Sequence, residues 1–155
     1  MREEYETHMQ YCITLARQAL RNGNPPVGAI IVHDRQIIGE GIESGKSTGD
    51  VTNHAEIIAI REAVAKVKQH LLSQSTLYTT HEPCIMCSYV IRHYNIPHIV
   101  YGIPVDYVGG ATAGFNVLGT ETVPQWGKKP RVTSGIYQAD CQRLSKQFLT
   151  LRERK

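Results

Sequence analysis

The chain has 155 residues, of which 41% are hydrophobic and 20% charged, with a formal net charge of +3 at pH 7. This length favours one domain over residues 1–155 that buries a core without disulfides, and no apolar run approaches the roughly 20 residues of a membrane helix. We therefore expect a cytoplasmic protein without membrane partners, and the scattered lysines and arginines permit contact with nucleic acid without arguing for it.

The first half of the chain alternates between helical and extended patterns. Apolar residues recur at helical spacing before NGNPP, and the continuous apolar run VGAIIVH is typical of a buried strand. The elements expected in chain order are a helix over 4–20, a hairpin of strands over 27–33 and 36–43 that turns at Asp34 and Arg35, a polar loop over 44–53 and a helix over 54–70.

The second half continues the alternation and adds one long glycine-rich stretch. The elements expected there are a strand over 75–80, a helix over 84–94 that Pro83 opens, a strand over 98–103, a loop over 104–129 with one helical turn near 115–118, a strand over 131–137 and a helix over 139–154. Strands alternating with helices indicate an α/β domain whose sheet lies between helical layers.

The four cysteines fall into two groups. Cys12 and Cys141 lie in helical patterns, where free cysteine usually acts as a small buried hydrophobe. Cys84 and Cys87 form a Cys-x-x-Cys pair within THEPCIMC, three positions apart at the start of a helix. That pair alone fits a redox couple, half of a structural zinc site, or part of a catalytic metal centre.

A histidine elsewhere in the chain favours the catalytic metal centre. His54 also opens a predicted helix, and two helix starts on one sheet would bring it to Cys84 and Cys87. Zinc accepts this ligand set, and three protein ligands leave its fourth position for water. Glu56 is then the natural group to carry a proton between that water and a substrate. No second Cys-x-x-Cys completes a zinc ribbon.

His-x-Glu followed by Pro-Cys-x-x-Cys is the signature of zinc deaminases. The chain resembles the cytidine-deaminase-like superfamily, most closely its tRNA adenosine deaminase and guanine deaminase branch, in PPVGAIIV, HAEIIAIREA, LYTTHEPCIMC and HIVYG. The end of the chain, with KPRVTSGIYQADC and QFLTLRER, is particularly similar to tRNA adenosine deaminases.

The resemblance implies a three-layer α/β/α sandwich with a central five-stranded mixed sheet, a homodimer, and hydrolytic loss of ammonia from a nucleobase. It implies that His54, Cys84 and Cys87 hold Zn²⁺ and that Glu56 shuttles the proton. The backbone N–H of Ala55 would help to hold the base.

Several residues depart from the family pattern around the substrate. Glu43 replaces an Asn that binds the base, and an ionised carboxylate only accepts hydrogen bonds, so the facing base edge should present N–H donors unless Glu43 points outward. Asn53 replaces a small apolar residue, and either caps the helix or supplies the missing amide. His81 either lines the pocket or, as we prefer, packs on the strand end.

These departures favour a deaminase of a free base or nucleoside such as guanine, isocytosine or cytosine. The loop VDYVGGATAG also lacks the basic residues that RNA contact would need. The alternative is a tRNA adenosine deaminase, with Phe148 and Arg152 meeting the nucleic acid, unless Phe148 is core and Arg152 a solvated helix end. A third hypothesis, a non-catalytic zinc-binding partner subunit, fits poorly with an intact Glu56.

Overall fold

The computed structural model describes residues 1–67 and 69–154, and none of the helices in these ranges is both long and apolar enough to cross a membrane. In chain order the elements are α1 (Arg2–Arg21), β1 (Gly28–His33), β2 (Gln36–Ile42), α2 (Gly45–Thr48), α3 (Ala55–Lys66), the 3₁₀ helix η1 (Gln69–Gln74), β3 (Thr76–His81), α4 (Ile85–His93), β4 (His98–Ile103), the 3₁₀ helix η2 (Pro124–Trp126), β5 (Arg131–Thr133) and α5 (Gln138–Glu153).

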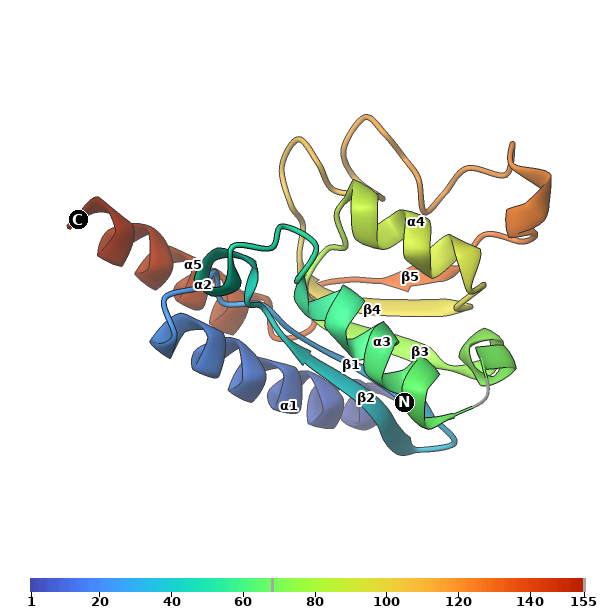
Figure 1. Ribbon diagram of the computed structural model, residues 1–155, viewed down its shortest axis with the longest axis horizontal. Helices are drawn as coiled ribbons and strands as arrows, with labels where there is room; N and C mark the ends of the chain where they lie inside the picture. The colour runs from blue at the N-terminus through green and yellow to red at the C-terminus, as the bar shows by residue number, and fades with distance from the viewer. Residues whose placement is uncertain (68, 155) are drawn as a thin grey trace.

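The sheet has five strands in the order β2-β1-β3-β4-β5. β1 pairs antiparallel with β2 and β3, whereas β3, β4 and β5 run parallel, so the sheet is mixed. Helices α1 and α5 cover one face, and α3 and α4 cover the other (Figure 1). The predicted three-layer α/β/α sandwich with a five-stranded mixed sheet is confirmed.

Two apolar cores, one on each face of the sheet, explain the continuous apolar run of β1. Ala29 and Ile31 pack with α3 and α4, while Ile30 and Val32 pack with α1 and α5. A strand buried on both faces needs apolar residues at every position, not at alternate ones. Cys12 and Cys141 are fully buried in the second core, as predicted.

Two glycines of β2 set the height of α3 above the sheet. A Cβ atom at Gly39 would overlap the carbonyl oxygen of Ala59, and one at Gly41 would overlap that of Ala55. Only a strand without side chains at these positions lets α3 lie directly on it. This contact fixes the first turn of α3, which carries the residues discussed below.

Four predicted elements differ from the structure. The helix expected over 54–70 ends at Lys66, because the chain turns to bury Leu72 from η1; position 68 of that prediction lies outside the described residues. The polar loop 44–53 contains the short helix α2. The strand expected over 131–137 stops at Thr133, because Gly135 has a φ of 82° and Tyr137 a φ of 53°.

The helical turn expected near 115–118 is present one residue later and stays a single turn. Thr120 N donates to Asn116 O at 3.1 Å, and Asn116 itself adopts a left-handed conformation with a φ of 45°, so no helix extends from it. A second helical turn lies at η2, where Pro124 takes a position that needs no backbone N–H.

Candidate metal centre and its surroundings

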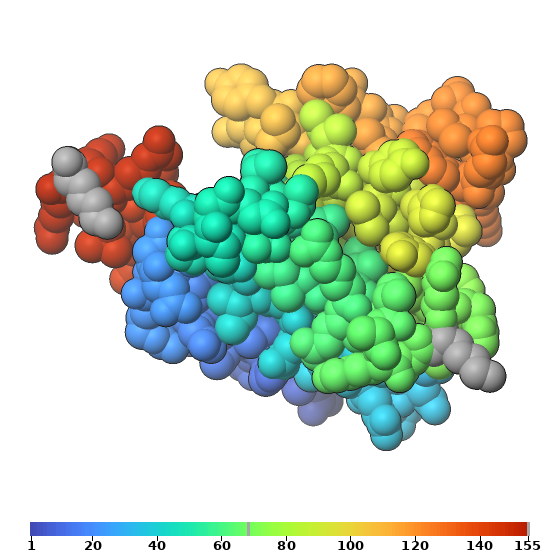
Figure 2. Space-filling view, in the orientation of Figure 1, coloured from blue at the N-terminus to red at the C-terminus, as the bar shows by residue number. Residues whose placement is uncertain are grey.

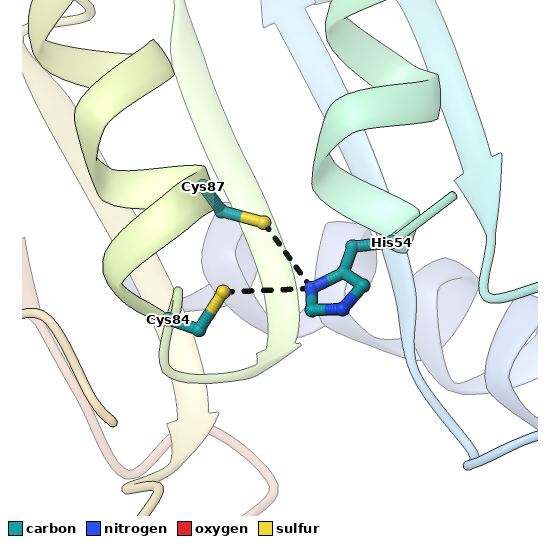
Figure 3. Close-up of side chains that lie close together, drawn as sticks. All are labelled: His54, Cys84 and Cys87. Carbon is teal, nitrogen blue, oxygen red and sulfur yellow. Dashed lines mark hydrogen bonds between the residues drawn. The ribbon is translucent and has the colours of Figure 1, made fainter. Parts of the chain in front are cut away.

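His54, Cys84 and Cys87 meet where two helices begin. His54 is the N-cap of α3 and Cys84 the N-cap of α4, both with extended backbone, and Cys87 lies in the first turn of α4. Figure 3 shows the three side chains converging from these two helix ends. Helix N-termini stabilise nearby negative charge, so they suit a site that holds thiolates.

The spacing of the three donor atoms fits a tetrahedral zinc ion. His54 Nδ1 lies 3.5 Å from Cys84 Sγ and 3.6 Å from Cys87 Sγ (Figure 3). All three donor atoms lie within 4.8 Å of one another. Zn–S and Zn–N bonds of ordinary length at tetrahedral angles place sulfur and nitrogen roughly 3.6 Å apart. The donor set therefore fits zinc and leaves a fourth position open.

Hydrogen bonding within the cluster sets its protonation. The bond from the Cys87 thiol lowers the pKa of Cys84 to about 4 against the opposing effect of burial, with further help from His54. The hydrogen bond to Cys84 raises the pKa of His54 to about 9. The hydrogen bond between the two cysteine side chains, together with burial, raises the pKa of Cys87. A metal that binds these atoms must displace the protons on His54 and Cys87.

Glu56 lies in the first turn of α3, only 4% exposed. Its Oε1 accepts a 2.7 Å hydrogen bond from the hydroxyl of Thr79, and its Oε2 lies 3.6 Å from Cys87 Sγ. One oxygen is thus held by the sheet while the other faces the metal cluster. Burial raises the pKa of Glu56 to about 7, although the Thr79 hydrogen bond opposes the shift.

Comparison with known proteins identifies the chemistry of this cluster. Residues 2–103 match the family described as the cytidine and deoxycytidylate deaminase zinc-binding region. The chain belongs to this deaminase family. It is a zinc-dependent hydrolytic deaminase, as predicted, and the cluster of His54, Cys84 and Cys87 offers the ligand set that zinc fits.

Individual relatives of this deaminase have two kinds of substrate in their names. A tRNA-specific adenosine deaminase from Haemophilus influenzae is 40% identical over 159 residues, covering 100% of this chain and 90% of its own. A solved structure from a study of A-to-I editing by tRNA:A34 deaminases has a TM-score of 0.78 and 28% identity, covering 89% of this chain and 98% of its own. The guanine deaminase of Bacillus subtilis is 36% identical with a TM-score of 0.61, covering 71% of this chain and 69% of its own.

Glu43 of this deaminase lies at the wall of the site and is 7% exposed. Burial raises the pKa of its carboxyl, and the charge of His54 opposes the shift. Its Oε2 accepts hydrogen bonds from the backbone N–H of Ser44 at 2.9 Å and of Gly45 at 3.3 Å. The carboxylate therefore holds the start of α2, and at least one of its oxygens is already engaged.

Asn53 ties the loop before α3 to the helix itself. Its amide nitrogen donates to Thr48 Oγ1 at 3.0 Å, and its amide oxygen accepts from Arg61 Nη1 at 3.0 Å. It does not cap α3, whose N-cap is His54. The predicted cap is wrong, because the side chain crosses the loop instead of folding over the helix start.

His81 connects β3 to α5. Its Nε2 lies 2.8 Å from Ser145 Oγ and its Nδ1 lies 2.9 Å from Thr80 Oγ1, and burial lowers its pKa to about 4. Both ring nitrogens contact protein hydroxyls, which agrees with the preferred interpretation of packing at the strand end. Ala55 is fully buried at the start of α3, where helix N–H groups lack partners within the helix.

Sequence reasoning missed Thr79 and gave Glu82 no role. Thr79 could have been found from the strand period, because alternation from Leu77 puts it on the α3 face beside Glu56. Glu82 is 2% exposed and accepts hydrogen bonds from the loop after β4. Burial alone would raise the pKa of Glu82, but hydrogen bonds, first from Thr112, lower it overall.

A basic groove runs between α5, the end of α1 and α2. The groove has two adjoining parts, and Leu20 and Leu151 line both of them. Phe148 is half-buried in the groove, and Lys46 Nζ lies 5.7 Å from the centroid of the Phe148 ring. The basic side chains that line it are Arg21, Lys46, Arg143, Lys146 and Arg152. Figure 2 shows α5, in red, standing out from the body beside the segment that contains α2.

Proposed function

We propose that this deaminase acts on adenosine in the anticodon loop of a tRNA and converts it to inosine. The sequence analysis preferred a free base or nucleoside, and the similarity to tRNA-specific adenosine deaminases along the whole chain favours its alternative instead. The observation that carries the proposal is the basic groove between α5, the end of α1 and α2. Residues 1–155 would act as one catalytic domain.

The groove supplies what the loop after β4 lacks. Phosphate contacts need lysine and arginine, and five such side chains line the groove. Phe148 adds an aromatic face on which an unpaired base can stack. Ser145 of α5 contacts His81, three positions before Cys84, so the helix that lines the groove also contacts the strand end that leads to the cluster.

The residues around the cluster suit a hydrolytic deamination. Bound zinc supplies a Lewis acid that makes a water nucleophilic near neutral pH. Glu56 would take one proton from a water whose oxygen attacks the amino-bearing carbon, and would give that proton to the adjacent ring nitrogen. As the carbon–nitrogen bond breaks, Glu56 would move the second proton of the same oxygen to the departing amine, so adenosine and water give inosine and ammonia. Burial raises the pKa of Glu56 above the usual range of a carboxyl group, toward the range that suits a group that accepts and releases protons.

Thr79 and Ala55 support these steps. The Thr79 hydroxyl holds Glu56 Oε1, which keeps Oε2 turned toward the cluster. The N–H of Ala55, in the first turn of α3, would donate to the bound base. The homodimer that the resemblance implies and the cytoplasmic location expected from the composition stay predictions.

One observation favours a second candidate, a deaminase of a free guanine-like base. Glu43 is a buried carboxylate beside His54, and an acceptor there suits a base edge with N–H donors. Adenosine presents no such edge apart from the leaving amino group. The bonds from Ser44 and Gly45 to Glu43 weaken this candidate, because they give the carboxylate a task in the loop.

The test offers the zinc-loaded protein an adenosine-containing anticodon stem-loop, the same stem-loop with guanosine at that position, and free guanine, isocytosine, cytosine and adenine. Ammonia release and the one-dalton mass gain of the RNA are measured, with Glu56→Gln as the blank. We expect inosine in the adenosine stem-loop alone. Turnover of a free base with an inert stem-loop would replace the tRNA proposal with the second candidate.

A further inference from the structure

Glu82 is a buried carboxylate that four donors surround. Its Oε1 accepts from Val105 N at 2.9 Å and from Thr112 Oγ1 at 2.6 Å. Its Oε2 accepts from Ala111 N and Thr112 N, both at 2.7 Å. Buried backbone N–H groups need acceptors, and here one carboxylate serves three of them. The side chain therefore pins the chain at both ends of the segment 105–112.

The middle of that segment contacts the turn that carries Cys84. Gly110 N donates to Pro83 O at 2.8 Å, and Ile85 N donates to Val108 O at 3.0 Å. Gly109 pairs with Cys84 in an isolated antiparallel bridge. Three successive residues of the loop thus hold three successive residues around the first thiolate, and Glu82 holds the loop on either side of them.

Gly109 shows how closely this loop wraps the carboxylate. A Cβ atom at Gly109 would lie 2.5 Å from Glu82 Oε2. A side chain at that position would push the loop away from Glu82, and with it the backbone that pairs with Cys84. The carboxylate of Glu82, the loop 105–112 and the turn that carries Cys84 therefore pack without room for a side chain at Gly109.

We propose that Glu82 is a positioning residue that fixes the orientation of Cys84 toward the metal through the loop 105–112. This inference rests on Cys84 being a zinc ligand, as the proposed function requires. Outer partners of metal ligands typically contribute 10-fold to 100-fold in metal affinity. Glu82 acts one step further out, through backbone contacts and not through a bond to the sulfur.

Arg92 provides a matched comparison at the other end of α4. It is 1% exposed, and its Nη1 donates to the carbonyls of Val117, Leu118 and Thr120 at 3.0, 3.1 and 2.6 Å. It holds the later part of the same long connection, one hydrogen bond further from the cysteine turn than the loop 105–112, since Leu118 N donates to Gly110 O at 2.9 Å. If Glu82 contributed only to stability, removing the charge of Glu82 and removing the charge of Arg92 would have the same effect on zinc affinity.

The experiment compares Glu82→Gln with Arg92→Gln in the full chain. Thermal stability, zinc affinity by chelator competition and the absorption spectrum of the cobalt(II)-substituted protein are measured. We expect both variants to melt earlier, since each leaves buried partners unsatisfied. Only Glu82→Gln should lose about 10-fold to 100-fold in zinc affinity and shift the cobalt spectrum. Equal zinc affinity and spectra in both variants, or in Glu82→Gln and the wild type, would overturn the proposal.

Thr112→Val keeps the test decisive if Glu82→Gln does not fold. This change removes only the 2.6 Å hydroxyl bond to Glu82 Oε1 and retains the backbone donors. We expect a smaller loss of zinc affinity with the same direction of spectral shift, and an unchanged spectrum would contradict the proposal. Cys84→Ser separates the two claims: if it leaves the wild-type cobalt spectrum intact, the ligand assignment itself is wrong.

Discussion

The metal cluster and the basic groove are built in opposite ways. The cluster is made by side chains that the fold buries or half-buries, fixed by hydrogen bonds of 2.7 to 3.6 Å and carried by two helix starts. The groove is made by exposed side chains from α1, α2 and α5, which keep their rotational freedom in solvent. The first region is rigid and supports chemistry, whereas the second is adaptable and suits a long charged ligand.

Interactions in the metal cluster and in the basic groove should respond differently to salt. Interactions in the cluster are little affected by salt, because charges that are buried or partly buried are weakly screened. Attraction between the groove and a phosphate chain depends on counterion release, so it falls steeply with salt. Changes in the cluster should therefore alter kcat, and changes in the groove should alter KM.

The largest effect is expected for Glu56→Gln. The amide cannot take a proton from water, so kcat on the adenosine stem-loop should fall by about 10²-fold to 10⁴-fold, the usual contribution of a general acid–base. Zinc content, measured by elemental analysis, should stay at one ion per chain, because Glu56 is not in the ligand set. A variant with more than about a tenth of wild-type kcat would remove Glu56 from the mechanism.

A smaller effect is expected for the double variant Lys46→Ala, Arg152→Ala in the groove. Losing two cations should raise KM for the stem-loop about tenfold and leave kcat within a factor of about two, because phosphate contacts position the RNA without touching the reacting base. The matched control is Lys128→Ala, Lys129→Ala, which removes the same charge just before β5. Equal KM changes in both variants would mean that net charge, and not the groove, attracts the RNA.

The smallest effect is expected for Glu43→Asn. In the tRNA account this carboxylate holds the Ser44 and Gly45 amides, and losing such bonds costs about tenfold at most in stem-loop turnover. If Glu43 instead binds a base edge of a free guanine-like substrate, the wild type turns over free guanine and not the stem-loop, and the variant loses the activity on guanine. Steady-state kinetics on both substrates, with Asn53→Ala as a control in the same loop, separates these outcomes.

The two regions also differ in how far the sequence predicts them. His54, Glu56, Cys84 and Cys87 are short-range motifs at helix starts, and the strand and helix periods that place those starts were visible in the sequence. Of the groove, only Phe148 and Arg152 were predicted to meet a nucleic acid. Its other cations lie far apart in the chain, and only the packing of α5 against α1 and α2 brings them together. Lysines and arginines that are scattered along the sequence therefore lie together in the folded protein.

The element ends that were placed wrongly follow from features that the local pattern does not record. β5 is three residues long because positive φ angles follow it, and α3 ends early because Leu72 turns into the core. The end of α3 thus depends on tertiary packing. The same holds for Glu82, whose partners at Val105, Ala111 and Thr112 follow it by more than twenty residues.

The salt dependence of catalysis on the adenosine stem-loop tests most directly that the two regions have separate tasks. We predict that kcat/KM falls by about tenfold or more between about 50 and 200 mM salt, while kcat changes little. A fall of this size is expected when the protein neutralises two or more phosphates of the RNA. The Lys46→Ala, Arg152→Ala variant should show a shallower slope. A kcat/KM that is independent of salt, or a slope unchanged in that variant, would contradict the account.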